Sequence, residues 1–222
     1  MKFVTNKELF ADYSRTAAKE LFEKTTYPWE ILPMISGFIM KLGPSLPEDE
    51  YEKRGDNVWV AKDAVIFDSA YIGGPCIIGH KTEVRQCAFI RGSALVGNGC
   101  VVGNSTELKN VILFDGVQVP HYNYVGDSIL GYKAHMGAGS ITSNIKADKK
   151  NILIKSGDEK IETGLRKIGA ILGDLTDIGC NSVLNPGSVI GPDTNVYPVS
   201  CVRGVVPGGS IYKDAEHIVQ RQ

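Results

Sequence analysis

The chain has 222 residues, of which 43% are apolar, and its formal net charge at pH 7 is −1. This apolar content can bury a substantial core in one domain, and it excludes intrinsic disorder. The 24 basic residues are scattered along the sequence, which excludes the basic stripe that nucleic-acid-binding proteins present.

The sequence also argues against a membrane or metal protein. The N-terminus has no apolar core of signal-peptide length, and no later stretch approaches the roughly 20 apolar residues of a membrane span. We therefore expect a cytoplasmic protein with neither a membrane nor a nucleic acid as partner. The five cysteines form no Cys-x-x-Cys pair, so the sequence predicts neither a disulfide framework nor a metal site.

Residues 1–57 are predicted to form a helical cap segment. Asn6 is expected to cap a helix that extends to about Phe22. The apolar stripe of this helix would consist of Leu9, Phe10, Tyr13, Ala17, Leu21 and Phe22. A second apolar segment, ILPMISGFIMKLG, follows Pro28. We expect the segment to cover the open first coil of the following domain, because an uncovered end would expose strand edges.

Residues 58–205 carry a repeat with a period of six. Ten large apolar residues follow one another at this interval: Val60, Ile66, Ile72, Ile78, Val84, Ile90, Val96, Val102, Leu108 and Phe114. The residue four places after most of them is small. A second run contains Leu172, Ile178, Leu184, Ile190, Val196 and Val202. Each hexad can form one short strand and a turn, and three strands close one coil that stacks on the next. The sequence therefore predicts an all-β fold, a parallel β-helix of hexapeptide repeats with an N-terminal α-helical cap.

Two interruptions divide the repeat. The register slips after Phe114, at the point where His121 occurs, and the series then continues at Val125, Leu130 and Met136. A charged stretch at about residues 144–167 is off register and is predicted to leave the column as an inserted loop. It could be a functional arm or a tolerated insertion, because loops on a rigid scaffold often carry binding residues. Residues 206–222 are expected to form a C-terminal tail.

The sequence PHYNYVGDSILGYKAHMGAGSITSN, residues 120–144, resembles the acetyltransferase domain of the bifunctional N-acetylglucosamine-1-phosphate uridylyltransferase/glucosamine-1-phosphate acetyltransferase. TGLRKIGAILGD, residues 163–174, resembles the archaeal sugar-phosphate nucleotidylyltransferase/acetyltransferase homologues. The resemblance covers about residues 58–205. It implies a left-handed β-helix, a homotrimer, and transfer of the acetyl group of acetyl-CoA to an amino-sugar phosphate. Glucosamine 1-phosphate is the acceptor expected, in the biosynthesis of UDP-N-acetylglucosamine and cell-envelope precursors.

The resemblance also implies roles for individual residues. His121 would be the general base that takes a proton from the sugar amine, and Glu107 the carboxylate that orients it. Substrate-binding roles fall on Arg91, Lys109, Tyr124, Asn144 and Lys150, of which Asn144 would contact the amine or the acetyl group and the others the phosphate. Ala138 and Ala170 match positions whose backbone approaches the coenzyme. Taken singly, each of these residues is also compatible with an ordinary surface or packing role.

Some features depart from the family or leave alternatives open. His135 replaces an asparagine near the substrate, and Ile145 replaces an aromatic neighbour of the coenzyme. The sequence has no N-terminal Gly-rich nucleotide-binding motif, so we expect no nucleotidyltransferase activity from this chain alone. One alternative is a catalytically inactive sugar-phosphate-binding or scaffold subunit. Another is a metal enzyme like the γ-class carbonic anhydrases, which would use His80, His121 and His135.

Overall fold

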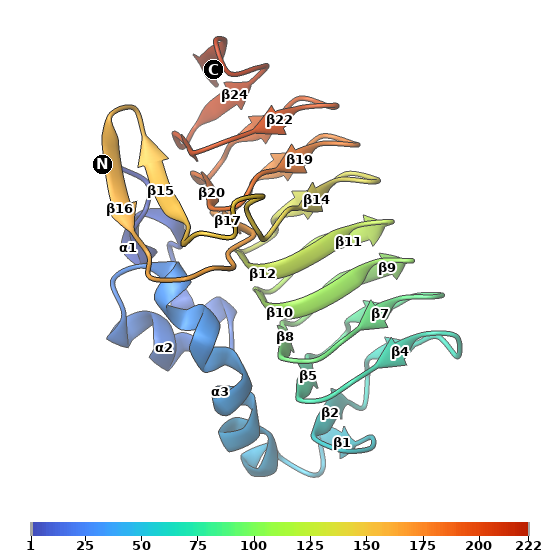
Figure 1. Cartoon of the computed structure of the whole chain (residues 1–222). Coiled ribbons are helices and arrows are strands. Elements are labelled where there is room, and N and C mark those ends of the chain that lie inside the picture. Colours follow the sequence, from blue (N-terminus) through green and yellow to red (C-terminus); the bar gives the residue numbers. More distant parts are fainter. Residues whose placement is uncertain (1, 222) are drawn as a thin grey trace.

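The computed structural model describes residues 2–221 and consists mainly of stacked three-sided coils, a parallel β-helix (Figure 1). Strands of successive coils pair in parallel. Val60 pairs with Ile78, which in turn pairs with Val96, so one coil advances by 18 residues. Three hexads therefore make one coil, and the fold predicted from the six-residue period is confirmed.

The three sides of the column are called faces A, B and C. Face A contains β2 (Val58–Ala61), β5 (Cys76–Ile78), β8 (Ala94–Val96), β17 (Ala170–Leu172), β20 (Ser188–Ile190), β23 (Val205–Val206) and the second halves of β10 (Glu107–Leu113) and β12 (Tyr124–Leu130). Face B contains β3 (Val65–Ile66), β6 (Glu83–Val84), β9 (Val101–Asn104), β11 (Gln118–His121), β13 (His135–Met136), β18 (Asp177–Ile178), β21 (Asn195–Val196) and β24 (Ser210–Tyr212). Face C contains β4 (Tyr71–Ile72), β7 (Phe89–Ile90), the first halves of β10 and β12, β14 (Ile141–Thr142), β19 (Val183–Leu184) and β22 (Cys201–Val202).

The aliphatic residues of the repeat form the core inside the column. On face A the inward row is at most 1% exposed and consists of Val60, Ile78, Val96, Leu113, Leu130, Leu172, Ile190 and Val206. Full burial of one such side chain contributes about 1.5–3 kcal/mol. The rows of faces B and C are at most 3% exposed from β6 and β7 onwards. The repeat therefore supplies one continuous core along the column.

The register changes earlier than the sequence suggests, and Phe114 is not in the column. Val96 pairs with Leu113, and Leu113 pairs with Leu130, so these two coils each advance by 17 residues. The prediction that Phe114 continues the inward series is therefore wrong. Its ring instead packs outside face A, stacked on Phe10 at 4.9 Å and edge-on to Phe22 at 5.0 Å. Phe114 is fully buried there because the N-terminal segment covers it.

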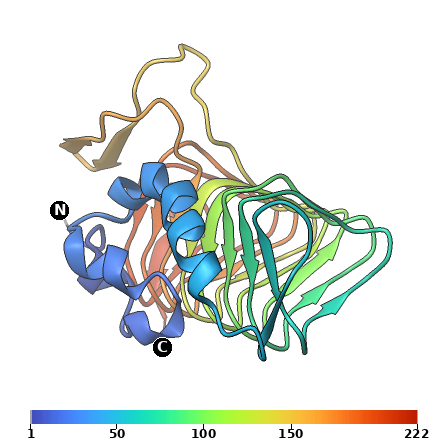
Figure 2. The same ribbon diagram turned by 90° about the horizontal axis from the view of Figure 1, so that it is seen from below.

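The N-terminal segment, residues 2–50, lies along the column. Its helices are α1 (Asn6–Leu9), η1 (Tyr13–Arg15), α2 (Lys19–Lys24), η2 (Pro28–Met34), α3 (Ile35–Leu42) and η3 (Gly43–Ser45). They run against the outside of face A, where α3 contacts β8 and β10 and η2 contacts β12 (Figures 1 and 2). The prediction that the N-terminal segment covers the first coil is therefore wrong. The reason is the outward row of face A, which is apolar and includes Ile77, Leu95, Ile112 and Ile129, all at most 2% exposed.

The helix expected from Asn6 to Phe22 is broken into short pieces. Thr5, rather than Asn6, caps α1, and its side chain forms a capping box with Glu8. Backbone amides of the column then bind carbonyl groups that a continuous helix would use. The carbonyl of Leu9 accepts a hydrogen bond from the Asp174 amide at 3.0 Å, and that of Arg15 accepts one from the Asp115 amide at 2.9 Å. Carbonyls used in this way are not available for a continuous helix.

Asp174 fastens this segment to the column. Asp174 is 8% exposed, and its carboxylate accepts hydrogen bonds from the amides of Ala11 and Tyr132, each at 2.8 Å. Burial raises the pKa of Asp174 above its ordinary value of 3.8. The folded state therefore holds the proton more tightly than the unfolded chain, and the stability that this group contributes falls as the pH rises through the raised pKa.

Asp174→Ala should loosen the N-terminal segment before the column. The loss of two charge-assisted hydrogen bonds should lower the free energy of unfolding by about 2 kcal/mol. The difference in the free energy of unfolding between the variant and the wild type should narrow as the pH rises through the raised pKa of Asp174, because the wild type loses stability there. Hydrogen exchange of the amides of residues 10–24 should accelerate, while amides of β5 and β8 stay protected. Asp158→Ala, at an exposed turn, is the control. Unchanged exchange in residues 10–24 would show that Asp174 does not fasten the segment.

Both ends of the column are closed by antiparallel strands. β1 (Tyr51–Lys53) pairs with β2 at the first coil, and β25 (Ile218–Gln220) pairs with β24 at the last. β1 occupies the edge of the first coil, which was predicted to be covered by helices, and β25 occupies the edge of the last coil. The stacking continues beyond residue 205 through β23 and β24, within the stretch expected to be a tail.

The insertion forms an arm that consists of a β-hairpin, β15 (Leu153–Ser156) and β16 (Glu159–Glu162) (Figure 1). The arm is docked at its root, because Ile152 and Ile154 are fully buried. Gly187, with φ +77°, permits this approach: a Cβ there would lie 2.6 Å from a methyl group of Ile152. The arm root therefore has a defined position beside the column.

Candidate functional site

His121 lies at the end of β11, at the corner between faces B and C. Its amide donates to Oδ1 of Asn123 at 3.1 Å, and its carbonyl accepts from the Gly139 amide at 3.0 Å. Asn123 is 2% exposed and donates to the carbonyls of Gly137 and Ser140, which fixes the corner. The imidazole itself is exposed. Within residues 2–221, no side chain hydrogen-bonds to it, so both ring nitrogens are accessible to a ligand.

Glu107 does not pair with His121 in this structure. It is the first residue of β10 on face C, where it lies opposite Tyr124 of the next coil. Its carboxylate bonds to Nη1 of Arg91 at 2.8 Å, and this bond raises the pKa of the Arg91 guanidinium. The register explains the difference, because it places Glu107 on face C, whereas His121 ends a strand of face B.

A buried carboxylate, Asp127, organises the corner between faces C and A. Asp127 is 4% exposed and accepts hydrogen bonds from Nζ of Lys109 at 2.9 Å and 3.0 Å. It also accepts from Nδ2 of Asn110 at 3.0 Å and from Nδ2 of Asn144 at 2.6 Å. Nδ2 of Asn144 lies 3.1 Å from the hydroxyl of Tyr124. These five residues, Lys109, Asn110, Tyr124, Asp127 and Asn144, are called the Asp127 group.

The structure thus brings together most of the predicted substrate-binding residues. Lys109, Tyr124 and Asn144 belong to the Asp127 group, and Arg91 with Glu107 lies beside them on face C. Burial and the carboxylates of Asp127 and Glu107 raise the pKa of Tyr124, which keeps its hydroxyl protonated. Asp127 itself was not among the residues predicted from the sequence. The available signal was its place directly after Gly126 among several predicted hydrogen-bond donors that need an acceptor.

The remaining predicted residues lie elsewhere. Lys150 is exposed in the turn at the arm base, where its amide donates to Asp148. Ala138 lies at the same type of corner as His121, between β13 and β14, and is half-buried. Ala170 is fully buried at the start of β17 on face A, and its amide donates to Oγ of Ser128 at 3.0 Å. Ala138 and Ala170 are therefore on different corners, and only Ala138 shares a corner with His121.

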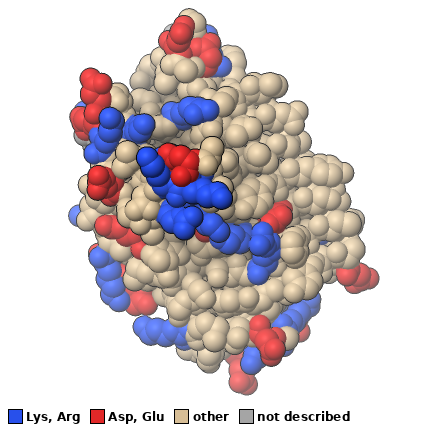
Figure 3. Space-filling model, in the orientation of Figure 1, with Lys and Arg blue, Asp and Glu red and all other residues tan. Residues whose placement is uncertain are grey.

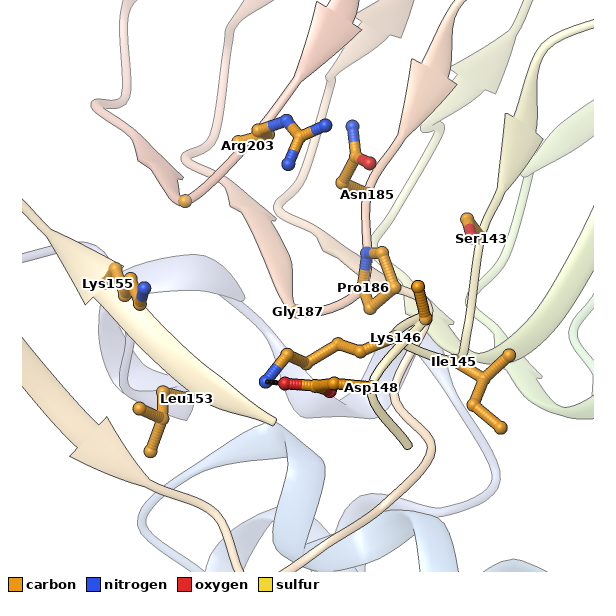
Figure 4. Close-up of a pocket in the computed structure, with 12 residues that line it drawn as sticks. Ser143, Ile145, Lys146, Asp148, Leu153, Lys155, Asn185, Pro186, Gly187 and Arg203 are labelled. Carbon is orange, nitrogen blue, oxygen red and sulfur yellow. Dashed lines mark ion pairs between the residues drawn. The ribbon is translucent and has the colours of Figure 1, made fainter. Parts of the chain in front are cut away.

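Two cavities flank the arm root. The first, of about 510 Å³, lies between β15 and the column and contains the ion pair of Lys146 and Asp148 (Figure 4). The second, of about 630 Å³, lies next to the Asp127 group and is called the η2 cavity. It is lined by Leu32, Pro33, Asn110, Asp127, Ile145, Lys149, Leu165, Arg166 and Lys167. Figure 3 shows Lys and Arg side chains gathered on this part of the surface. Ile145 lines both cavities and is 41% exposed.

The other histidines lie apart from His121. His80 bonds to Asp63 at 2.9 Å near the first coils, and His135 bonds to Asp177 at 2.8 Å on face B. Among residues 2–221, no group of three or more His, Cys, Asp or Glu side chains is arranged to hold a metal ion. Across the same residues, no helix is long and apolar enough to cross a membrane.

The stacked six-residue repeats and the polar corners of face C define a hexapeptide-repeat β-helix protein. Residues 72–215 match the family described as GMPPB C-terminal domain. This range is more than half of the chain, and the chain belongs to that family.

The relatives carry the same kind of domain. The chain is 29% identical over 190 residues to the bifunctional sugar-1-phosphate nucleotidylyltransferase/acetyltransferase of Sulfurisphaera tokodaii, over 84% of this chain and 47% of the relative. It is 30% identical over 200 residues to the bifunctional protein GlmU of Methanococcus maripaludis, over 88% of this chain and 48% of the relative. The chain spans about half the length of these two proteins. The resemblance read from residues 120–144 and 163–174 is confirmed.

One further relative is similar in length to this chain, and solved structures also align with it. The chain is 28% identical over 201 residues to the uncharacterized acetyltransferase YaiX of Escherichia coli, over 82% of this chain and 85% of the relative. Among solved structures, the acetyltransferase domain of PglB from Neisseria gonorrhoeae aligns with 73% of this chain and 57% of its own, at 15% identity and a TM-score of 0.41. That domain has also been solved in complex with acetyl coenzyme A, and this structure aligns with 74% of this chain and 57% of its own, at 15% identity and a TM-score of 0.34.

Proposed function

We propose that this chain transfers the acetyl group of acetyl-CoA to the amine of an amino sugar that carries an anomeric phosphate. Glucosamine 1-phosphate is the first acceptor to test. The observation that carries the proposal is the arrangement across face C: an exposed imidazole at one corner, and two cations with hydrogen-bond donors at the other. A sugar lying over Glu107 and Tyr124 would place its amine toward His121 and its phosphate toward Arg91 and Lys109.

His121 would act as the general base in this reaction. The amine nitrogen forms a bond to the thioester carbonyl carbon, the carbon–sulfur bond breaks so that coenzyme A leaves as the thiolate, and the imidazole takes the proton from nitrogen. Bound acetyl-CoA supplies the activated acyl group. Ala138, which is half-buried at this type of corner, is the predicted coenzyme-binding residue that lies on the side of His121. Ala170 does not fit this role, because its amide is bonded to Ser128.

A binding subunit without catalysis is the second candidate. It is favoured by one observation, the pairing of Glu107 with Arg91, which leaves His121 without an orienting carboxylate in this structure. Release of free coenzyme A from acetyl-CoA separates the two functions. Release that depends on glucosamine 1-phosphate, together with an acceptor heavier by one acetyl group, supports the enzyme. No release with glucosamine 1-phosphate, galactosamine 1-phosphate or a nucleotide-linked amino sugar supports the binding subunit.

We also propose a homotrimer in the cytoplasm, with the site completed between subunits and the product used for UDP-N-acetylglucosamine or cell-envelope precursors. An exposed apolar strip that spans the corner between faces B and C supports an interface. It consists of Val65, Phe67, Tyr71, Phe89 and Tyr122, each between 36% and 65% exposed. In a closed three-fold assembly, the strip of each subunit would contact a different surface of the next subunit.

Sedimentation equilibrium should give a mass three times the 24.1 kDa of one chain. Tyr71→Glu with Phe89→Glu should shift the mass toward one chain, because two charges would be buried without partners. Lys62→Glu with Lys160→Glu changes exposed positions outside the strip and should leave the trimer intact. A wild-type mass of 24.1 kDa would contradict the proposed assembly.

A further inference from the structure

The η2 cavity continues the candidate site beyond the Asp127 group. It contains Asp127 and Asn110 on the column side. Its opposite wall is joined to the same group through the backbone, because Lys167 forms an antiparallel bridge with Ile145, and the Ile168 amide donates to the Asn144 carbonyl at 3.1 Å. A ligand that reaches the corner at Asn144 therefore has an open cavity directly beside it.

The charges at the corner are already balanced before the cavity begins. Arg91 pairs with Glu107, and Lys109 pairs with Asp127, so two cations face two carboxylates. The cavity itself adds Lys149, Arg166 and Lys167, all exposed. Within residues 2–221, none of these three forms an ion pair. The uncompensated positive charge of the site thus lies in the cavity rather than at the corner.

The cavity also has an apolar wall. The N-terminal segment supplies Leu32 and Pro33, and the arm root supplies Ile145 and Leu165. Apolar lining with a few charged groups is typical of pockets for organic ligands, and about 630 Å³ lies within the usual range of such pockets. A single sugar phosphate bound over face C would leave both the cations and the apolar wall unused.

We propose that the η2 cavity binds a nucleoside diphosphate group attached to the acceptor. The amino sugar then lies over face C, the phosphate next to the sugar lies at the corner, and the second phosphate is bound by Lys149, Arg166 and Lys167. The base and ribose pack against Leu32 and Pro33. This inference rests on the proposed function for the sugar, and it specifies the acceptor as a nucleotide-linked amino sugar.

Binding can be measured without turnover, by calorimetric titration of the full chain with UDP, with GDP and with glucosamine 1-phosphate. At least one nucleotide should bind at least tenfold more tightly than glucosamine 1-phosphate. Arg166→Glu with Lys167→Glu should weaken nucleotide binding at least tenfold. Lys62→Glu with Lys160→Glu, the same charge change at exposed positions outside both cavities, should have no effect. Thermal unfolding of both variants checks that they fold as the wild type does.

Coenzyme A also contains a nucleoside diphosphate, so the source of the group must be distinguished. Acetyl-CoA titrated into the wild type and the Arg166/Lys167 variant should bind with equal affinity. The proposal is overturned if neither nucleotide binds, if the variant binds nucleotides as the wild type does, or if only acetyl-CoA binding weakens. Nucleotide binding that is lost in the variant, with no acetyl transfer to any acceptor, would support the cavity and contradict the proposed function.

Discussion

His121→Ala should lower the acceptor-dependent release of coenzyme A by a factor of about 10²–10⁴, the usual contribution of a positioned general base. The side chain is exposed and forms no contact that holds the corner, because Asn123 does so through the backbone. Thermal stability should therefore change little. The variant should still bind acetyl-CoA and acceptor in titrations, since the loss concerns proton transfer.

The matched control is His217→Ala, another exposed histidine that bonds to Asp214 near the end of the chain. It should keep the wild-type rate. A rate in His121→Ala within a factor of about two of the wild type would exclude His121 as the base. In that case His121 would be an ordinary surface histidine, and the reaction would need another proton acceptor on face C.

Asp127→Ala should have the second largest effect, because it removes the acceptor of three side chains at once. Lys109 would remain largely buried without its counter-charge, and Asn110 and Asn144 would each lose a hydrogen bond. Removing one partner of a buried pair costs about 3–5 kcal/mol, and the partial exposure of Lys109 reduces this to about 2–3 kcal/mol. Denaturant unfolding measures the loss.

Asp127→Asn tests the same residue with its shape retained. It keeps one oxygen as acceptor but leaves the charge of Lys109 uncompensated, so the Michaelis constant for the acceptor should change more than the turnover number. Asp177→Ala removes an exposed carboxylate paired with His135 and should cost less than about 1 kcal/mol. A variant at Asp127 no less stable than Asp177→Ala would show that the Asp127 group does not depend on its carboxylate.

The period of six predicted the β-helix and its core because spacing alone determines which side chains point inward. It did not locate the slip correctly, since Leu113 and Phe114 are both large and apolar, and only the N-terminal segment decides which one points outward. The position of the N-terminal segment could not be predicted from its own apolar residues either, because these residues do not show which surface they pack against. Its partner is the outward row of face A, whose apolar character is not part of the inward repeat.

The candidate site was predictable in part. Resemblance identified the residues that the structure gathers near Asp127, because they occur at fixed offsets from His121. It did not predict that Glu107 pairs with Arg91, since that depends on the choice between two partners on neighbouring coils. Asp127 and the cations of the η2 cavity escaped notice because burial and a shared cavity are properties of the assembled chain. Ala138 and Ala170 look equivalent in sequence but lie at different corners.

The N-terminal segment also restricts how this protein can change in length. Repeat proteins gain or lose units by duplication or deletion, because each coil contacts only its neighbours. Here Leu9 is bonded to the coil of Asp174 and Arg15 to the coil of Asp115, and a single coil, that of Leu130, lies between these two. A coil added between them would pull these contacts out of line. A segment outside the repeat therefore fixes the spacing of these three coils, whereas coils could be added at the ends of the column without breaking these two contacts.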